Sequence, residues 1–438
     1  MSKKYYFKSS SLTLYKEGNK YYKNDEELKP EEQGSNYTEQ NFDREIKSAV
    51  SSWINNNFDN IICLIGAGAS VILGQDKKTD KNYGQTVYMI AQEIFSVLSS
   101  GKYSFDSKEQ DVFTLEELIS KVKYAEVLTD MNGGENIIDS FVSLSNSGSS
   151  KELSPDFNLE NFLSVLLSYE KFVPEDYKDM LDNSIKAIFQ EIIKATSYNY
   201  DDDKFKHDKF LNILSKLTKK EQKLNIVTTN YDTLIEDAAN REGFTVLDGF
   251  KFAQIPTFDS SMFNWHLIKD IPNVKTKEVE YMSKVINLFK IHGSLTWEID
   301  STGKEIIRKS KDDVNKPVMV FPSSDKYAQS YQEPYFELFT KFQELLKRSN
   351  TLLITSGFSF ADNHISRMLF QAIKSNVSLH VLVSDYNIEP DNPNNNWSEL
   401  IKMHGKDYQI ALLQATMNGK LTDYLGAERK NEHRQLLF

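Results

Sequence analysis

Short apolar runs alternate with amphipathic stretches along most of this chain. Continuous apolar runs are typical of strands that are buried on both faces, whereas apolar positions three and four residues apart are typical of helices. The pattern predicts strands at 60–65, 224–228, 286–291, 318–321, 351–355 and 379–383. It predicts helices at 39–56, 87–98, 232–241, 335–348 and 365–375. This alternation predicts an α/β fold with a Rossmann-like, doubly wound and mostly parallel sheet.

Two regions depart from that alternation. Aromatic and polar positions alternate from Tyr5 to Tyr15 and again at Tyr21 and Tyr22. This pattern predicts an N-terminal β-hairpin appendage, with one strand from Tyr5 to Tyr15, a turn, and a second strand at Tyr21 and Tyr22. From about residue 111 to 220 no convincing strand stands out, and the spacing predicts a large all-helical insertion. Its predicted helices are 113–127, 137–144, 159–167, 174–195 and 205–217.

These elements predict four segments along the chain. They are the hairpin appendage with its linker (1–38), the first part of the Rossmann-like domain (39–110), the helical insertion (111–222), and the second part of the domain with a C-terminal helical tail (223–438).

Composition and charge narrow the possible classes of function. The 438 residues carry a formal net charge of -11 and no dense cluster of Lys and Arg, so direct binding of nucleic acid is disfavoured. Cys63 is the single cysteine, which excludes an intramolecular disulfide and a cysteine-rich zinc site. No apolar run approaches the roughly 18 residues that span a bilayer, and no signal peptide is evident. We therefore expect a cytoplasmic protein that does not act at a membrane.

A glycine-rich string follows the first predicted strand of the domain. It reads Gly66-Ala67-Gly68-Ala69-Ser70, and glycines at such a turn let the backbone approach a pyrophosphate closely. The dinucleotide fingerprint of dehydrogenases requires a third glycine where Val71 stands, which disfavours hydride transfer. The alternative interpretation is a tight turn between a strand and a helix.

Polar side chains follow two further predicted strands. Asn230 and Asp232, in Thr229-Asn230-Tyr231-Asp232, are two residues apart, so their carboxamide and carboxylate can face the same crevice. The alternative role of Asp232 is to cap the next helix. His292 follows the strand 286–291, where an imidazole can accept a proton near neutral pH. In a parallel sheet all these side chains would meet at the carboxyl edge.

Together and in this order, the strings resemble the sirtuin superfamily, specifically the bacterial sirtuin-like proteins of anti-phage defence. A further stretch, Gly357-Phe358-Ser359-Phe360-Ala361-Asp362, is similar to their late Gly-x-Ser-x-x-Asp segment. The resemblance implies an NAD site in which Asn230 orients the ribose or the attacking water, Asp232 receives the nicotinamide amide, and His292 is the base. The implied NAD contacts are Gly66, Ala67, Gly68, Ala69, Ser70, Thr229, Gly357, Ser359 and Asp385.

The sequence departs from the protein deacylases of this superfamily in two ways. It lacks the four cysteines of their zinc ribbon, so no zinc or other metal is expected. Their Gly-Ile-Pro-Asp-Phe-Arg loop is replaced by a polar stretch that includes Gln75-Asp76-Lys77-Lys78. Water is therefore the expected nucleophile, and the expected enzyme is an NAD+ hydrolase (NADase) that releases nicotinamide and ADP-ribose. The alternatives are a subunit that senses NAD or ADP-ribose, and an NAD-dependent protein deacylase or ADP-ribosyltransferase.

The resemblance also implies a biological setting. Depletion of NAD in anti-phage defence by abortive infection is toxic, so the enzyme needs restraint. Restraint by assembly implies a homo-oligomer that works with a separate HerA-type ATPase.

Overall fold

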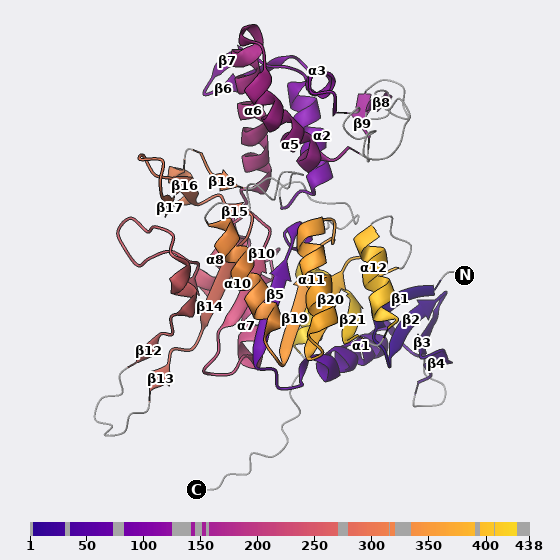
Figure 1. Ribbon diagram of the computed structural model, residues 1–438. Coiled ribbons are helices and arrows are strands. Elements are labelled where there is room, and N and C mark those ends of the chain that lie inside the picture. Colours follow the sequence, from indigo (N-terminus) through magenta and orange to yellow (C-terminus); the bar gives the residue numbers. More distant parts are fainter. Residues whose placement is uncertain are drawn as a thin grey trace.

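The computed structural model of the chain is shown in Figure 1. It describes residues 3–30, 36–72, 83–124, 142–144, 151–154, 157–269, 279–314, 316–319, 334–389, 395–406 and 408–426.

A single large sheet organises the described residues. Its parallel strands, in spatial order, are β11 (Thr245–Leu247), β14 (Val285–Lys290), β10 (Leu224–Thr228), β5 (Asn60–Ile65), β19 (Thr351–Ser356), β20 (Leu379–Asp385) and β21 (Ile410–Gln414). The chain adds strands on one side of β5 and then returns to add strands on the other. β5 therefore lies at the topological switch point, where open α/β sheets bind ligands.

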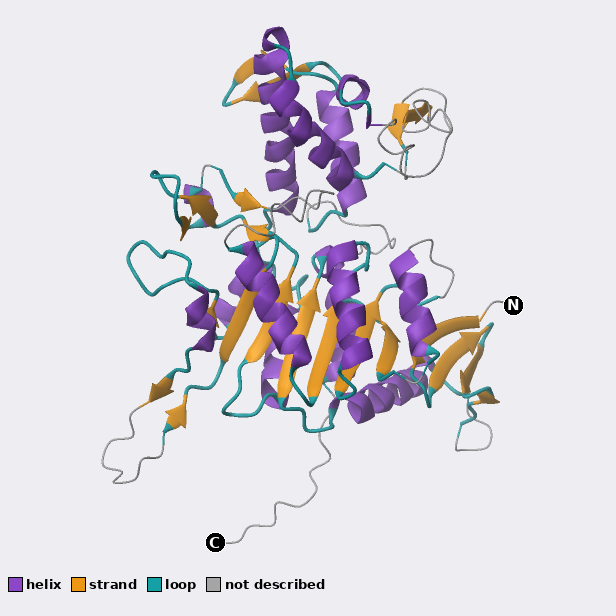
Figure 2. Cartoon of the chain, viewed as in Figure 1, coloured by secondary structure: helices purple, strands orange, loops and turns teal. Residues whose placement is uncertain are grey.

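Helices cover both faces of this sheet (Figure 2). One apolar core contains residues of α1 (Glu39–Ile54), α7 (His207–Leu217), α8 (Leu234–Arg241) and α13 (Thr422–Leu425). The core on the other face contains residues of α10 (Tyr335–Lys347), α11 (Asn363–Ser375) and α12 (Asn395–His404). Two covered faces explain why the central strands are mostly apolar, and they confirm the predicted Rossmann-like, doubly wound fold.

The N-terminal strands are antiparallel, as expected, and they extend the main sheet. They are β1 (Lys3–Lys8), β2 (Thr13–Glu17), β3 (Lys20–Lys23) and β4 (Glu26–Glu27), and β1 pairs antiparallel with β21. The predicted single strand from Tyr5 to Tyr15 is wrong, because the chain turns where the Ser9 amide donates to the Leu12 carbonyl. Tyr5 and Tyr15 are instead partners across the first hairpin.

A third apolar core lies in a separate unit beyond the carboxyl ends of the parallel strands (Figure 1). Its elements are α2 (Val87–Leu98), β6 (Lys102–Phe105), β7 (Lys108–Asp111), α3 (Leu115–Lys121), β8 (Val142–Leu144), β9 (Lys151–Leu153), α5 (Leu159–Tyr169), the 3-10 turn η3 (Glu170–Phe172) and α6 (Glu175–Thr196). We call it the helical unit.

The helical unit differs from the predicted all-helical insertion (111–222) in several details. It begins with α2, which was predicted within the first part of the Rossmann-like domain, and it contains the strand pairs β6–β7 and β8–β9. The predicted helix 137–144 ends in residues that form strand β8, which pairs with β9, and its residues 137–141 lie outside the described part of the chain. Val142-Ser143-Leu144 alternates apolar and polar residues, which favours a strand over a helix. The predicted helix 205–217 is present as α7, and it packs on the sheet rather than in the core of the helical unit.

Small antiparallel pairs border the sheet near β14. They are β12 (Ile268–Lys269) with β13 (Glu280–Tyr281), β15 (Gly293–Ser294) with β18 (Val318–Met319), and β16 (Trp297–Ile299) with β17 (Ile306–Arg308); the 3-10 turns η4 (Ser260–Asn264) and η5 (Lys311–Asp313) lie nearby in the chain. The predicted sheet strand 318–321 is thus a partner of β15 over its first two residues, and the other two lie outside the described residues. No helix in the described part of the chain is long and apolar enough to cross a membrane.

Candidate functional site

Three of the predicted site segments follow the ends of neighbouring parallel strands, namely β5, β10 and β19. Ile65, at the end of β5, is paired with Thr228 of β10 on one side and with Ser356 of β19 on the other. The Gly-rich turn, the segment from Thr229 and the segment from Gly357 therefore leave the sheet side by side. The Thr229 amide donates to the Ile65 carbonyl at 3.1 Å, which holds the second of these segments against the first.

Ser70 joins Asn230 and Asp232 in one buried hydrogen-bond network. Its hydroxyl donates to Asp232 Oδ2 at 2.7 Å and accepts from Asn230 Nδ2 at 3.1 Å. Asn230 Nδ2 also donates to the Gly66 carbonyl at 3.1 Å. Asn230 Oδ1 is buried and has no hydrogen-bond partner among the described residues. Because a buried acceptor without a partner is costly, this oxygen is a candidate ligand contact.

The two carboxylate oxygens of Asp232 make different contacts. One carboxylate oxygen, Oδ1, accepts from the Leu234 amide at 3.2 Å at the start of α8, while the other accepts from Ser70. Burial raises the pKa of Asp232, and the nearby charge of Lys290 opposes that rise. The capping interpretation and the ligand-site interpretation are therefore compatible, because they use different oxygens.

The Gly-rich turn packs backbone to backbone against the turn at Gly357. The Gly66 amide donates to the Ser356 carbonyl and the Gly68 amide to the Gly357 carbonyl, both at 3.0 Å. Within the 3-10 turn η1 (Ala67–Ala69), the Ala69 amide donates to the carbonyl of Gly66. These glycines are required for the packing of the two turns, and the exposed residue Ala67 presents the turn to solvent.

His292 follows β14, and its side chain lies near Asp362, which follows β19. Its Nε2 is 3.4 Å from Asp362 Oδ2, and both side chains are largely buried. Asp362 caps α11 by accepting from the amides of His364 and Ile365 at 2.9 and 3.1 Å. β14 and β19 are separated by β10 and β5, so this contact brings together loops from either side of the switch point. The imidazole therefore lies over the carboxyl ends of the strands between β14 and β19.

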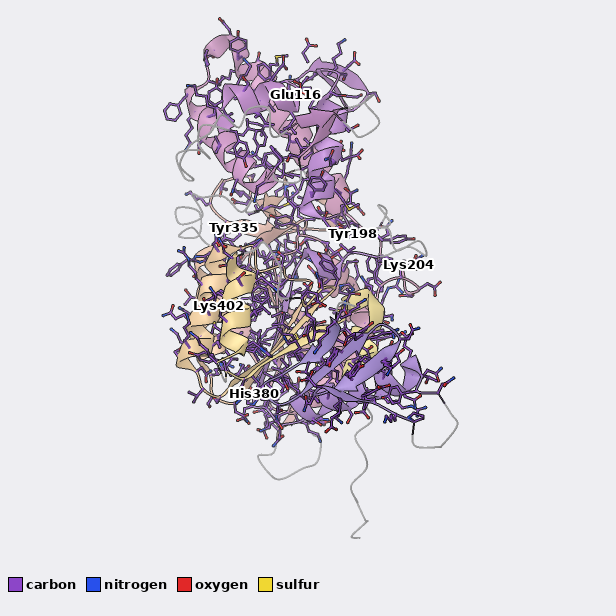
Figure 3. The ribbon with its side chains drawn as sticks, turned by 90° about the vertical axis from the view of Figure 1, so that its right-hand side faces the viewer. Glu116, Tyr198, Lys204, Tyr335, His380 and Lys402 are labelled. Atoms are coloured by element: carbon purple, nitrogen blue, oxygen red, sulfur yellow. The ribbon has the colours of Figure 1, made fainter. Side chains whose placement is uncertain are left out.

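Both connections to the helical unit also touch this edge. A Cβ on Gly84, which precedes α2, would lie 2.1 Å from the Ser70 carbonyl oxygen. Tyr198, which follows α6, is close enough to Asp232 for the carboxylate to contribute to the raised pKa of the phenol. Figure 3 shows Tyr198 and Tyr335 between the helical unit and the sheet. The two connections to the helical unit therefore lie at the same sheet edge as the Ser70 network.

The remaining predicted residues lie along the same edge without joining the Ser70 network. Ser359 is exposed beyond the turn at Gly357, and its hydroxyl accepts from the Ala361 amide at 3.4 Å. Asp385 ends β20, two strands from β5, where burial raises its pKa to about 6. The described residues contain no group of three His, Cys, Asp or Glu side chains that could hold a metal.

Sequence reasoning missed several residues that support the site. Lys290 contacts the Asp232 carbonyl and Glu236 from within β14. Asn418, in the π-turn η6 (Met417–Leu421), donates to the carbonyls of Ala69 and Val71 at 2.8 and 3.0 Å. A lysine inside the apolar run 286–291 was a visible signal for the first, whereas nothing local marked Asn418.

Comparison with known families identifies one matching domain. Residues 224–383 match the family model described as SIR2-like domain. This range begins with β10 and ends within β20, so it contains Asn230, Asp232 and His292 but not the Gly-rich turn. No curated protein matches the chain at a significant level. The match supports membership of the sirtuin-like superfamily and an NAD-related activity.

Proposed function

We propose that the chain is an NAD+ glycohydrolase whose crevice lies at the carboxyl end of β5. The observation that carries this proposal is the buried network of Ser70, Asn230 and Asp232, with the Asn230 Oδ1 acceptor left without a partner among the described residues. A site that serves only as a packed turn has no need of an unsatisfied buried acceptor. The SIR2-like match over 224–383 favours NAD as the molecule that supplies the missing donor.

The proposed reaction breaks the bond between C1′ of the ribose and the nicotinamide nitrogen. The bonding electron pair leaves with nicotinamide, and a sugar cation with oxocarbenium character develops at C1′. A water oxygen then bonds to C1′ and loses one proton, so the products are nicotinamide, ADP-ribose and a proton. The protein's task is to hold the leaving group and place the water.

Each residue has one proposed role. Asn230 Oδ1 accepts from a ribose hydroxyl or from the attacking water. Asp232 accepts from the nicotinamide carboxamide and is oriented by the Ser70 hydroxyl. His292 takes the proton from water, and Asp362 at 3.4 Å stabilises the imidazolium that results. The Gly-rich turn, Gly357, Ser359 and Asp385 are proposed to contact the phosphates and the adenosine.

The direct test is chromatography of NAD after incubation with the purified chain. Hydrolysis gives nicotinamide and ADP-ribose in equal amounts, and Asn230→Ala or His292→Ala abolishes both while the chain stays folded. His380→Ala is the matched histidine control, because His380 packs against Trp53 and Phe58 far from the crevice. Full activity in both site variants would refute the assignment of these residues.

The same assay separates the two alternatives. A sensor of NAD or ADP-ribose binds the nucleotide and leaves it intact. A deacylase or ADP-ribosyltransferase releases nicotinamide only when an acyl-lysine peptide or another acceptor protein is added.

We further propose, from the resemblance alone, that the enzyme depletes NAD in anti-phage defence as a homo-oligomer with a HerA-type ATPase. Co-expression with such an ATPase followed by size-exclusion chromatography tests the assembly. Elution of the two proteins as separate species would contradict it.

A further inference from the structure

A lysine lies in the interior directly behind the proposed site. Lys290 ends β14, and its side chain is 2% exposed. Its ammonium donates to Glu236 Oε1 at 2.8 Å and to the backbone carbonyl of Asp232. Lysine is rarely buried, because removing its charge from water costs several kcal/mol unless partners compensate. The chain therefore keeps a costly buried charge here, which Glu236 and the Asp232 carbonyl compensate.

The contacts of Lys290 join the two halves of the proposed site. Asp232 lies in the loop between β10 and α8, and Glu236 lies in the first turn of α8. His292 is only two residues beyond Lys290 along the chain. One ammonium group therefore connects the loop that carries Asn230 and Asp232 to the strand end that carries His292.

We propose that Lys290 is a positioning residue for NAD cleavage: its ammonium fixes the Asp232 loop relative to His292 and places a positive charge beside the Asp232 carboxylate. This inference rests on the proposed function of the site. Lys290 lies behind the loop and is not proposed to touch NAD.

The electrostatic surroundings of Asp232 explain why a cation is needed. The groups that face it are the Ser70 hydroxyl, Lys290 of β14, Glu236 and Asp237 of α8, and Tyr198 from the connection to the helical unit. Burial raises the pKa of both Asp232 and Glu236, and Lys290 is the cation that lowers both. Loss of the Lys290 charge should therefore raise the pKa of both acids further.

Protonation of Asp232 would also disturb Asn230. In the present network the Ser70 hydroxyl donates to Asp232 and accepts from Asn230. A protonated Asp232 becomes a donor itself, so its contact with Ser70 no longer requires the hydroxyl proton to point toward it. Loss of the Lys290 charge therefore affects Asp232 directly and Asn230 through the Ser70 hydroxyl.

The test compares Lys290→Met with the double variant Lys290→Met, Glu236→Gln. Met preserves most of the length of the lysine side chain. The double variant also removes the Glu236 carboxylate, which loses its ion-pair partner when Lys290 is replaced. Lys290→Met should lower kcat about tenfold or more at pH 7, and the acid limb of its pH profile should move about one pH unit higher. The double variant should melt close to wild type and still show the low kcat. Glu191→Gln is the control, because Glu191 is a buried carboxylate in the helical unit, bonded to Tyr103 at 2.6 Å.

A second measurement does not depend on catalysis. The Asp232 carboxyl carbon can be titrated by NMR in protein labelled with ¹³C at aspartate, with the resonance assigned by Asp232→Asn. The titration midpoint should be higher in Lys290→Met than in wild type, even if the chain does not hydrolyse NAD. A folded Lys290→Met with unchanged kcat and an unchanged Asp232 titration would overturn the inference. So would recovery of full activity in the double variant, since that result would assign Lys290 to stability alone.

Discussion

Gly357 and Gly68 lie backbone to backbone, at a separation that leaves no room for a side chain on either residue. A Cβ on Gly357 would lie 2.4 Å from the Gly68 carbonyl carbon and 2.1 Å from the Ala69 amide nitrogen. Gly357 also has φ of +64°, which L-residues adopt at a cost. The two turns that flank the switch point are thus a single packed unit.

Gly357→Ala should therefore destabilise the protein strongly. The clash is with backbone, which cannot move aside as a flexible side chain would, so we expect a loss of about 3 kcal/mol or more. Gly303→Ala is the matched control, since Gly303 has φ of +74° and a Cβ added there would meet nothing within 4 Å. That control should lose only about 1 kcal/mol. Thermal melting of both variants checks the difference, and equal losses would contradict it.

Ser70→Ala removes the hydroxyl that holds Asn230 and Asp232 together. It leaves Asp232 Oδ2 without its 2.7 Å donor, so we expect a loss of about 1–3 kcal/mol in stability and a large loss of NAD hydrolysis. Ser184→Ala is the matched control, because the Ser184 hydroxyl is also buried and bridges the Phe113 amide and the Met180 carbonyl. The melting temperature should fall by a similar amount in the two variants. The rate of NAD consumption should fall only in Ser70→Ala.

Asn418→Ala should lower the affinity for NAD, although Asn418 lies outside the residues that match the SIR2-like domain. The side chain donates to the carbonyls of Ala69 and Val71 and accepts from the Lys206 amide at 3.2 Å, so its loss frees the Gly-rich turn on one side. Asn376→Ala is the matched control: Asn376 donates to the carbonyls of Leu346 and Arg348 and accepts from the Ser378 amide, near the start of β20. NAD affinity, measured by calorimetry, should fall at least about tenfold only in the first variant. Equal affinity in the two variants would remove Asn418 from the site.

The sequence identified those elements whose signal is local. The bounds of β5 and β10 agree with their mostly apolar runs, because a strand buried on both faces carries few polar positions. The helix α7 was found from its amphipathic spacing, yet spacing shows only that one face is buried and not what covers it. Its place on the sheet could be learned only from the structure.

Features that join distant parts of the chain left no such signal. β21 closes the parallel series and pairs with β1, some four hundred residues earlier, so its partners are not visible in any window of sequence. The site shows the same limit. Ser70, Asn230 and Asp232 were grouped because each follows a strand, whereas Asn418 reaches the Gly-rich turn from a segment that has no motif.

Asp362→Asn separates the charge of Asp362 from its role as a helix cap. Asn caps a helix as well as Asp does, so α11 should remain intact. The free energy of unfolding should change by less than about 1 kcal/mol. The variant lacks the negative charge near His292 Nε2, so NAD hydrolysis should fall about tenfold or more. Asp259→Asn is the control, since Asp259 caps η4 through the Ser261 amide. Unchanged hydrolysis in Asp362→Asn would show that His292 acts without this carboxylate.

Asp385→Asn should change how stability depends on pH. Burial raises the pKa of Asp385 from 3.8 to about 6, so between these values the folded state binds more protons than the unfolded state. Stability contributed by this group therefore falls as pH rises through that window. The variant should be more stable than wild type by up to about 3 kcal/mol above pH 6, and the difference should vanish below about pH 4.

Asp300→Asn is a control for Asp385→Asn, because its effect on the pH dependence of stability should have the opposite sign. Hydrogen bonds from Thr302 and from the amides of Lys304 and Glu305 lower the pKa of Asp300 to about 2. Its contribution to stability is present above the ordinary pKa of 3.8 and is lost as pH falls toward 2, so the variant should be less stable than wild type at neutral pH. Denaturant unfolding of wild type and both variants from pH 3 to pH 8 should show the two opposite trends. If Asp385→Asn instead loses stability as pH rises, the carboxylate of Asp385 is stabilised by a cation or ligand rather than penalised by burial.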